Sequence, residues 1–156
     1  MKHILNIEHH NMNYILIALR SDCLCYQLAY FLNKLSSFDF KRVDEDLHYS
    51  VNNKKVFFPT FVDWNSELKR KSFLIKNKYI YKLKLDSTGL FKHNHISKTI
   101  LLIPELKQFD YLLKLSGVWK GTELHILKEN LNNLTQIASQ NTIELNNLKS
   151  ISNLVF

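Results

Sequence analysis

Residues 14–20 read Tyr-Ile-Leu-Ile-Ala-Leu-Arg, a short apolar run bounded by polar residues. A run of this length and composition predicts a β-strand that is covered on both faces. The next residues predict a helix over about 21–35, because apolar residues recur there at helical spacing and Ser21 is placed to cap the first free amides. The alternating stretch 38–43 then predicts a second strand, which completes a βαβ start.

The middle of the chain predicts antiparallel strands joined by short polar connections. Six β-rich runs carry this prediction: 47–51, 56–62, 72–75, 79–85, 99–103 and 110–115. The pair Asn52-Asn53 predicts a tight hairpin turn, because asparagine tolerates positive φ better than most residues. Pro59 indicates that its strand is an edge or carries a bulge, because proline has no amide to donate.

The last third of the chain predicts a second helix over about 122–138. Thr122 is placed to cap it, and five apolar residues follow at steps of 3, 4, 3 and 4 along one face. A short turn and a terminal strand at 154–156 are predicted to follow. Without linkers or repeats, residues 1–156 predict a single α+β domain: a mixed, mostly antiparallel sheet with the two helices packed on one side.

Positive charge is concentrated in one part of the chain. The net charge is +7, but residues 54–98 alone hold eleven basic and three acidic residues, so the remainder is close to neutral. This pattern favours an anionic partner for the segment 54–98. Eighteen of the 21 basic residues are lysine, and this weakens a nucleic-acid interpretation, because arginine supplies the planar fork that grips phosphate. Compositional drift in an AT-rich genome explains the same excess of lysine without a function.

Aromatic residues alternate with the basic ones in this segment, and two interpretations stay open. Bases of a single-stranded RNA stack on exposed aromatic rings beside a basic groove. Alternation with period two also predicts the same rings inside the core and the lysines outside. The aromatic residues are Phe57, Phe58, Phe61, Trp64, Phe73, Tyr79, Tyr81 and Phe91. The candidate basic surface consists of Lys69, Arg70, Lys71, Lys82 and Lys84.

No pattern in the chain predicts catalysis, a metal site or a cofactor. Phosphate-binding glycine loops and the nucleophile elbow are absent, and the CxC pair Cys23 and Cys25 lacks the second pair that zinc sites show. On a helix these two thiols point in different directions and do not bridge, which predicts a reducing compartment. The carboxylates of residues 44–46 suit Mg²⁺, although a solvated turn is favoured. With no apolar leader or membrane span, a cytoplasmic location is expected.

The nine residues from Ile103 to Tyr111 read Ile-Pro-Glu-Leu-Lys-Gln-Phe-Asp-Tyr. This string resembles the signature of the bacterial IPExxxVDY family, with Phe109 in the valine position. The likeness extends to the strand at 14–20, the helical stretch 26–33 and the end of the chain, and so covers most of it. The resemblance implies no activity, because the family has none assigned. Some members are encoded near genes of fatty-acid synthesis and pyruvate kinase, which implies a metabolic protein as partner.

The motif itself is consistent with either a structural corner or a binding site. Pro104 ends a strand, because it fixes φ and pushes the residue before it to extended geometry. Glu105 and Asp110 are placed to accept from free amides or to pair with a lysine, and a buried Tyr111 needs an acceptor for its hydroxyl. Because loops at chain reversals also carry binding residues, Pro104, Glu105, Asp110 and Tyr111 are candidate binding residues.

The prediction for function is a non-catalytic cytoplasmic binding or adaptor protein. It is expected to meet an acidic protein, such as an acyl carrier protein or a metabolic enzyme, through a lysine-rich sheet face. The alternative is an RNA- or ribosome-associated protein that binds through residues 54–98. A third hypothesis is an enzyme that uses Glu105, Asp110 and Tyr111 or the carboxylates of 44–46.

Overall fold

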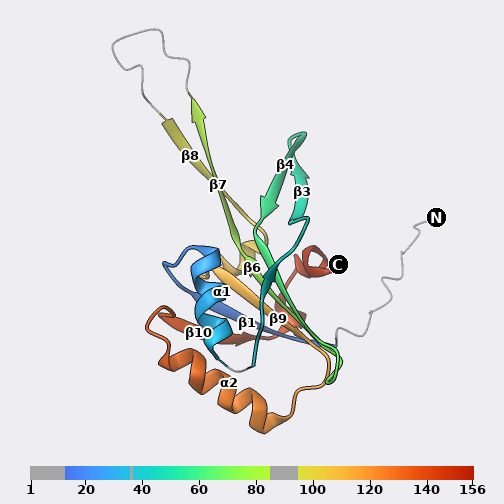
Figure 1. Cartoon of the computed structure of the whole chain (residues 1–156). Coiled ribbons are helices and arrows are strands. Elements are labelled where there is room, and N and C mark those ends of the chain that lie inside the picture. Colours follow the sequence, from blue (N-terminus) through green and yellow to red (C-terminus); the bar gives the residue numbers. More distant parts are fainter. Residues whose placement is uncertain (1–12, 36, 85–94) are drawn as a thin grey trace, which may run out of the picture.

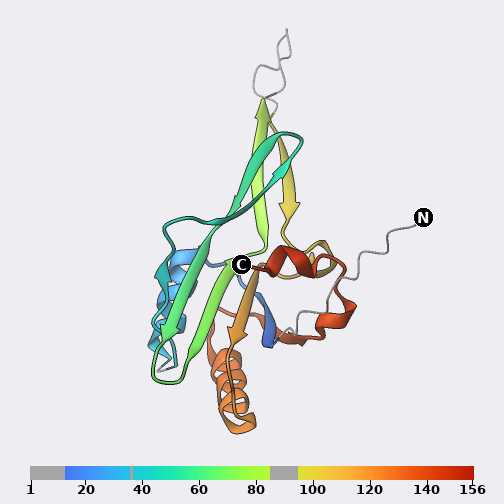
Figure 2. The same cartoon turned by 90° about the vertical axis from the view of Figure 1, so that its right-hand side faces the viewer.

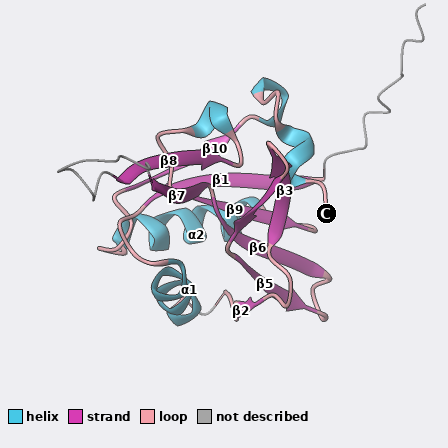
Figure 3. Cartoon of the chain, turned by 90° about the horizontal axis from the view of Figure 1, so that it is seen from above, coloured by secondary structure: helices cyan, strands magenta, loops and turns pink. Residues whose placement is uncertain are grey.

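A computed structural model describes residues 13–35, 37–84 and 95–156, which form an α+β fold (Figure 1). Its main sheet has six strands in the order β10-β1-β9-β6-β5-β2, and every pair is antiparallel. The strands are β1 (Tyr14–Arg20), β2 (Lys41–Arg42), β5 (Thr60–Asn65), β6 (Arg70–Lys76), β9 (Tyr111–Ser116) and β10 (Ser139–Ile143). Figure 3 shows this sheet from above.

Two hairpins rise from one end of this sheet (Figures 1 and 2), and their ends diverge in the view of Figure 1. One pairs β3 (Leu47–Val51) with β4 (Lys54–Phe58), and the other pairs β7 (Lys78–Lys84) with β8 (His95–Leu101). The helices are α1 (Cys25–Lys34) and α2 (Gly121–Asn133), and single 3₁₀ turns occupy η1 (Pro104–Leu106), η2 (Leu145–Asn147) and η3 (Ile151–Leu154).

The strand β1 has the predicted bounds and is covered on both faces. Ile17 and Leu19 pack in one apolar cluster together with buried residues of both α1 and α2. Leu16 and Ala18 pack in a second cluster on the other face, with the η1 loop, the β3–β4 hairpin and the C-terminal turns. Figure 2 shows α1 on one side of the sheet and the C-terminal turns on the other. Apolar clusters therefore cover both faces of the main sheet along β1.

Both helices differ from their predicted bounds and caps. The first begins at Cys25, where the Gln27 side chain accepts from the Leu24 amide at 3.1 Å. Ser21 caps no helix, because its hydroxyl accepts from the Cys23 amide and donates to the Gln136 carbonyl. The second begins at Gly121, so Thr122 lies inside the helix and caps nothing.

The end of the second helix was predicted too late, and the end of the chain is not a strand. The helix stops at Asn133, and the Ala138 amide bonds to the Arg20 carbonyl at 2.8 Å to start the edge strand β10. Ile137 still packs in the helical cluster, so the apolar spacing continued past the helix. Leu154 is buried in a 3₁₀ turn rather than in the predicted strand 154–156.

The predicted βαβ start is also wrong. Only Lys41–Arg42 of the stretch 38–43 pairs, and it does so at the far edge of the sheet, antiparallel to β5. The strands β9, β6 and β5 lie between β1 and β2. By contrast, Asn52 and Asn53 form the predicted hairpin turn with φ of 48° and 63°.

Pro59 divides the predicted strand 56–62 into β4 and β5, and Asn77 divides the facing strand into β6 and β7. The two long strands are paired up to the bond from the Lys76 amide to the Pro59 carbonyl, at 2.9 Å. The Asn77 amide donates to the Asp110 carbonyl and the Asn77 carbonyl accepts from the Leu102 amide, both on the other side of the strand. Beyond Asn77, β4 and β7 are not paired with each other. We call this divergence at Pro59 and Asn77 the fork.

The Asn77 side chain is fully buried and holds the loop of the nine-residue motif. Its Oδ1 accepts from the Ile103 amide at 2.8 Å, and its Nδ2 donates to the carbonyls of Leu106 at 3.0 Å and Phe109 at 3.2 Å. One side chain thus satisfies the Ile103 amide and the Phe109 carbonyl, while the Leu106 carbonyl also accepts from the Phe109 amide at 3.0 Å.

On the face that carries the C-terminal turns, Lys114 is a buried cation without a carboxylate partner in the described chain. Its Nζ donates to the Leu154 carbonyl at 2.7 Å and lies 4.2 Å from the ring centroid of Phe156 and 4.7 Å from that of Tyr14. Burial, together with repulsion from Lys71, lowers the pKa of Lys114 to about 8. The ammonium is therefore retained in a site that favours the neutral amine.

We expect the substitution Asn77→Ala to lower the free energy of unfolding by about 3 kcal/mol, because it leaves the buried Ile103 amide and the Phe109 carbonyl without partners. Chemical denaturation measures the change. Asn132→Ala, at an exposed position of α2, is the matched control and should cost nothing. A loss below about 1 kcal/mol for Asn77→Ala would contradict the bonding described for this side chain.

Lys114 should make stability rise with pH over an alkaline window. Because the folded state binds this proton more weakly than the unfolded state, the free energy of unfolding increases between the folded pKa of about 8 and the ordinary value of 10.5. Relative to Lys114→Met, the wild type should gain about 2 kcal/mol between pH 7.5 and 10.5, measured by denaturation at each pH. Parallel pH profiles of the two proteins would show that Lys114 is not desolvated.

Candidate binding groove between the two hairpins

A groove of about 400 Å³ lies between the β3–β4 and β7–β8 hairpins, directly above the fork. Its lining comes from both hairpins: Val51, Asn52, Lys54, Lys55, Val56, Tyr79, Tyr81, Lys82 and Ile100. The volume is in the range of pockets that hold small ligands or a few residues of a peptide.

The groove is cationic. Lys54, Lys55 and Lys82 line it, all three are exposed, and its lining contains no carboxylate. The strands of the two hairpins, β3, β4, β7 and β8, contain no aspartate or glutamate at all. Between the lysines, the half-buried rings of Tyr79 and Tyr81 lie 6.1 Å apart and form an apolar floor with Ile100.

Aromatic packing fixes the base of the groove. The Tyr49 hydroxyl on β3 donates to the Leu101 carbonyl on β8 at 2.8 Å, and burial raises the pKa of this tyrosine. The Tyr49 ring stacks on Phe58 at 5.4 Å between centroids, and Phe58 meets Tyr79 edge to face at 6.5 Å. Both hairpins are therefore anchored to each other at their base while their ends diverge.

The carboxylates of 44–46 contribute to this anchoring. Asp46 accepts from the Thr60 amide at 3.0 Å and pairs with Arg42, and Glu45 lies 3.6 Å from the His48 ring. Asp46 thus ties the start of β3 to the start of β5. Within the described ranges, no three His, Cys, Asp or Glu side chains are placed to hold a metal ion together.

The predicted basic surface does not form one patch. Lys69 and Lys71 are exposed at the β5–β6 turn, at the opposite end of the sheet from Lys82 (Figure 1). Arg70 is 9% exposed and pairs with Glu123, so assigning it to the surface was wrong. The Lys84 side chain and residues 85–94 of the basic segment lie outside the described part.

Arg70 is buried because it anchors the start of α2. Its Nε donates to the Val118 carbonyl at 2.7 Å, and its guanidinium lies 4.3 Å from the Trp119 ring centroid. The Glu123 carboxylate accepts a hydrogen bond from the Arg70 guanidinium and another from the Lys120 amide, the latter at 2.8 Å. These two hydrogen bonds, with that from Arg70 the stronger influence, hold the pKa of Glu123 below its usual range.

The aromatic residues of this segment are divided between core and surface: Tyr79 packs partly against a core cluster, whereas Phe57 is 40% exposed. Phe58, Phe61 and Phe73 are buried in the two apolar clusters. Trp64 is 60% exposed, but it lies on β5 in the main sheet rather than at the groove. Phe91 lies outside the described residues.

The nine-residue motif is divided between two contacts. Glu105 Oε1 accepts from the amides of Lys149 and Ser150 at 2.8 and 2.9 Å, which fastens the C-terminal turns to η1. Partial desolvation acts to raise the pKa of Glu105, but the hydrogen bonds outweigh it and lower the pKa. Pro104 is exposed at the start of η1, and Ile103, Leu106 and Phe109 pack inward.

Asp110 and Tyr111 face the α1 side instead. Asp110 accepts from the Ser21 amide at 2.9 Å and pairs with Lys78 at 2.8 Å. The Tyr111 hydroxyl donates to the Cys23 carbonyl, and burial, with the nearby Cys25 and Asp110, raises the pKa of this tyrosine.

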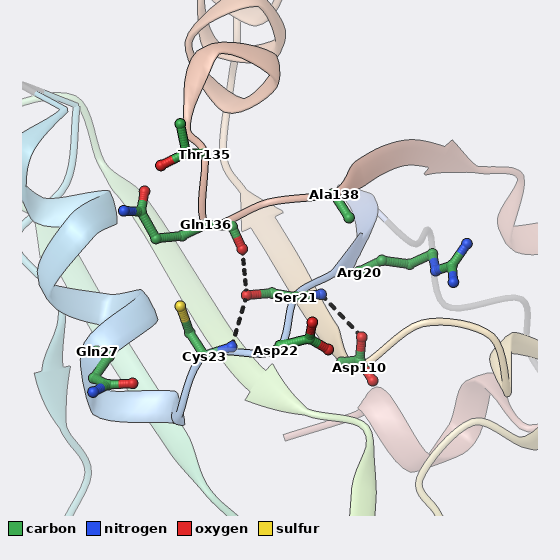
Figure 4. A pocket seen from close by; sticks show the side chains of 9 residues that line it. All are labelled: Arg20, Ser21, Asp22, Cys23, Gln27, Asp110, Thr135, Gln136 and Ala138. Atoms are coloured by element: carbon green, nitrogen blue, oxygen red, sulfur yellow. Dashed lines mark hydrogen bonds between the residues drawn. The ribbon is translucent and has the colours of Figure 1, made fainter.

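Asp110 also lines a second, polar cleft of about 440 Å³, in which its bond to Ser21 is visible (Figure 4). The Ser21 hydroxyl there bonds to backbone groups of Cys23 and Gln136. Both cysteines are free thiols. Because Glu105 and Asp110 bond different segments, the motif acts as a corner that joins three parts of the chain rather than as one cluster of side chains.

Sequence reasoning named Tyr79, Tyr81 and Lys82 but did not single out Lys54, Lys55 or Asn77. Lys54 and Lys55 directly follow the Asn52-Asn53 turn, so their placement at a hairpin end was accessible from the sequence. Asn77 lies between Lys76 and Lys78 and looks like part of a polar connection. Only the fold shows that it is buried.

The fold and the groove define a small α+β protein with a cationic, tyrosine-lined cleft between two hairpins. No family model, no curated protein and no solved structure matches the chain. The likeness to the IPExxxVDY family therefore stays a prediction. Neither described helix has the length and apolar character needed to cross a membrane.

Proposed function

We propose that the chain is a non-catalytic cytoplasmic binding protein and that it engages an acidic protein through the groove between its two hairpins. One observation carries this proposal. Three exposed lysines and two tyrosines converge on one open groove whose lining contains no carboxylate.

The uncompensated charge of Lys54, Lys55 and Lys82 supports an acidic partner. These ammonium groups repel one another across the groove, and a partner carboxylate relieves that repulsion while it gains its own pairing. Such complementarity raises the association rate and excludes basic competitors, and it weakens with salt. Tyr79 and Tyr81 add rigid apolar area, which is typical of residues that contribute most to interfaces.

Three other basic residues are already paired with carboxylates of the chain and are less suited to this role. Arg42 and Arg70 pair with Asp46 and Glu123, and Lys78 pairs with Asp110. These cations stabilise the fold. The two free cysteines are compatible with the reducing compartment that the proposal assumes.

RNA binding is the second candidate, and the same groove favours it, because tyrosine rings beside lysines also suit single-stranded bases. Two observations weaken this candidate. No arginine lines the groove, and Phe58, Phe61 and Phe73 are not available for stacking.

Affinity capture from native cell extract at low salt, with and without nuclease, tests the proposal. We expect one acidic protein to remain bound after nuclease treatment. The captured amount of this protein should fall at least tenfold with the triple variant Lys54→Glu, Lys55→Glu, Lys82→Glu, because the reversed charges repel its carboxylates. The control, Lys69→Glu with Lys71→Glu, reverses exposed charges at the opposite end and should retain it.

Two results would overturn this assignment. Capture that is unchanged by the triple variant would remove the groove as the binding surface. Loss of all captured material with nuclease, together with a steep fall of binding with salt, would establish the RNA alternative instead.

A further inference from the structure

The groove lies between the free edges of two strands. The long strand formed by β4 and β5 faces the long strand formed by β6 and β7, and these are paired from the Asn65–Arg70 end up to Pro59. If the pairing continued at the same register, Lys55 would face Ile80. It does not continue, because β4 pairs only with β3 and β7 only with β8.

The backbone groups of Lys55 and Lys82 point away from their hairpin partners. Val51 and Lys54 flank the two-residue turn and so form a hydrogen-bonded pair, which makes the next pair, Ser50 and Lys55, a non-bonded one. On the other hairpin the Leu102 amide bonds to the Asn77 carbonyl, so Asn77 and Leu102 are a hydrogen-bonded position of the ladder. Bonded and non-bonded positions alternate from there, and Lys82, opposite Ser97, falls on a non-bonded position, so its backbone groups point outward.

Both of these residues line the groove. Within the described chain, no backbone bond occupies the outward amide and carbonyl of either one. Unpaired strand edges bind a further strand readily, and natural proteins often protect such edges with lysine. Here the lysines leave the edges open to an extended chain of opposite charge.

Resting on the proposed function, we infer that the acidic partner inserts an extended segment into the fork, between the outward edges of β4 and β7. Its backbone bonds to Lys55 on one side and Lys82 on the other. Its acidic side chains meet Lys55 and Lys82, which share one face of the continued register, whereas Lys54 lies on the face of Tyr81. Alternate apolar side chains pack on Tyr79, Tyr81 and Ile100, because side chains alternate along a strand.

The geometry of the fork restricts how the segment lies. The strands β4 and β7 run in opposite directions, as continuations of the antiparallel pair β5 and β6. An inserted strand is therefore antiparallel to one edge and parallel to the other. The free edges of the main sheet suit this partner less, because β2 has only two residues and β10 carries no cation.

The probe is an acetylated and amidated octapeptide of alternating glutamate and valine, with amide hydrogen exchange of the full-length protein measured by NMR. We expect the exchange of the Lys55 and Lys82 amides to slow at least tenfold when the peptide binds. The Ser50 amide is the matched control, because it also points away from its partner strand but lies on the far edge of β3. Its exchange rate should not change.

A second measurement separates the contribution of backbone hydrogen bonds to peptide binding from the contribution of charge. Methylation of the four valine amides, or of the four glutamate amides, removes the donors of one peptide edge and keeps every carboxylate. Either modification should weaken binding, followed by fluorescence anisotropy, at least tenfold. The affinity of the triple charge-reversal variant for the unmodified peptide should also be at least tenfold lower than that of the wild type.

These results distinguish the mode of binding from the proposed function. If binding needs the lysines but ignores amide methylation, and the two amides stay unprotected, then strand insertion is wrong and the acidic partner stands. If charge reversal has no effect on either peptide or captured protein, then the proposed function is wrong. A peptide that does not bind at millimolar concentration overturns strand insertion.

Discussion

The buried side chain of Asn77 is the interaction on which the rest of the structure depends. It holds the loop of the nine-residue motif against the end of β6 with bonds to Ile103, Leu106 and Phe109. Its backbone amide donates to the Asp110 carbonyl and its carbonyl accepts from the Leu102 amide, on the side of the strand away from β4. One residue thus closes the core and marks the position where β6 ends and β7 begins to pair with β8. The fork lies at this position.

Opening a pair of strands exposes hydrogen-bonding edges, which is a liability for a protein in solution. The hairpins meet this liability with charge, because Lys54, Lys55 and Lys82 surround the opening and their strands carry no carboxylate. Two copies of the groove repel each other, whereas an acidic segment is attracted. In the proposed function, the same three side chains oppose self-association and select an acidic partner.

The sequence predicted the elements whose signals are local. The apolar run of β1 and the Asn52-Asn53 turn are correct, because burial on both faces and positive φ each leave a direct mark on residue type. Helix caps failed, since Ser21 bonds across the fold to Gln136 rather than to its own helix. The edge strand β10 was missed because its sequence, Ser-Gln-Asn-Thr-Ile, has no apolar alternation and pairs only through its backbone. The groove escaped because no local signal showed that Asn77 is buried or that Arg70 is used inside.

Cross-strand contacts in the free protein, observed by NMR, test the central claim most directly. The account predicts contacts between Thr60 and Ile75, which are paired, and none between the backbones of Lys55 and Ile80, where the same register would continue. A free protein in which Lys55 and Ile80 form a regular ladder would contradict the account, because the fork would then be closed and the groove filled by the protein's own strands.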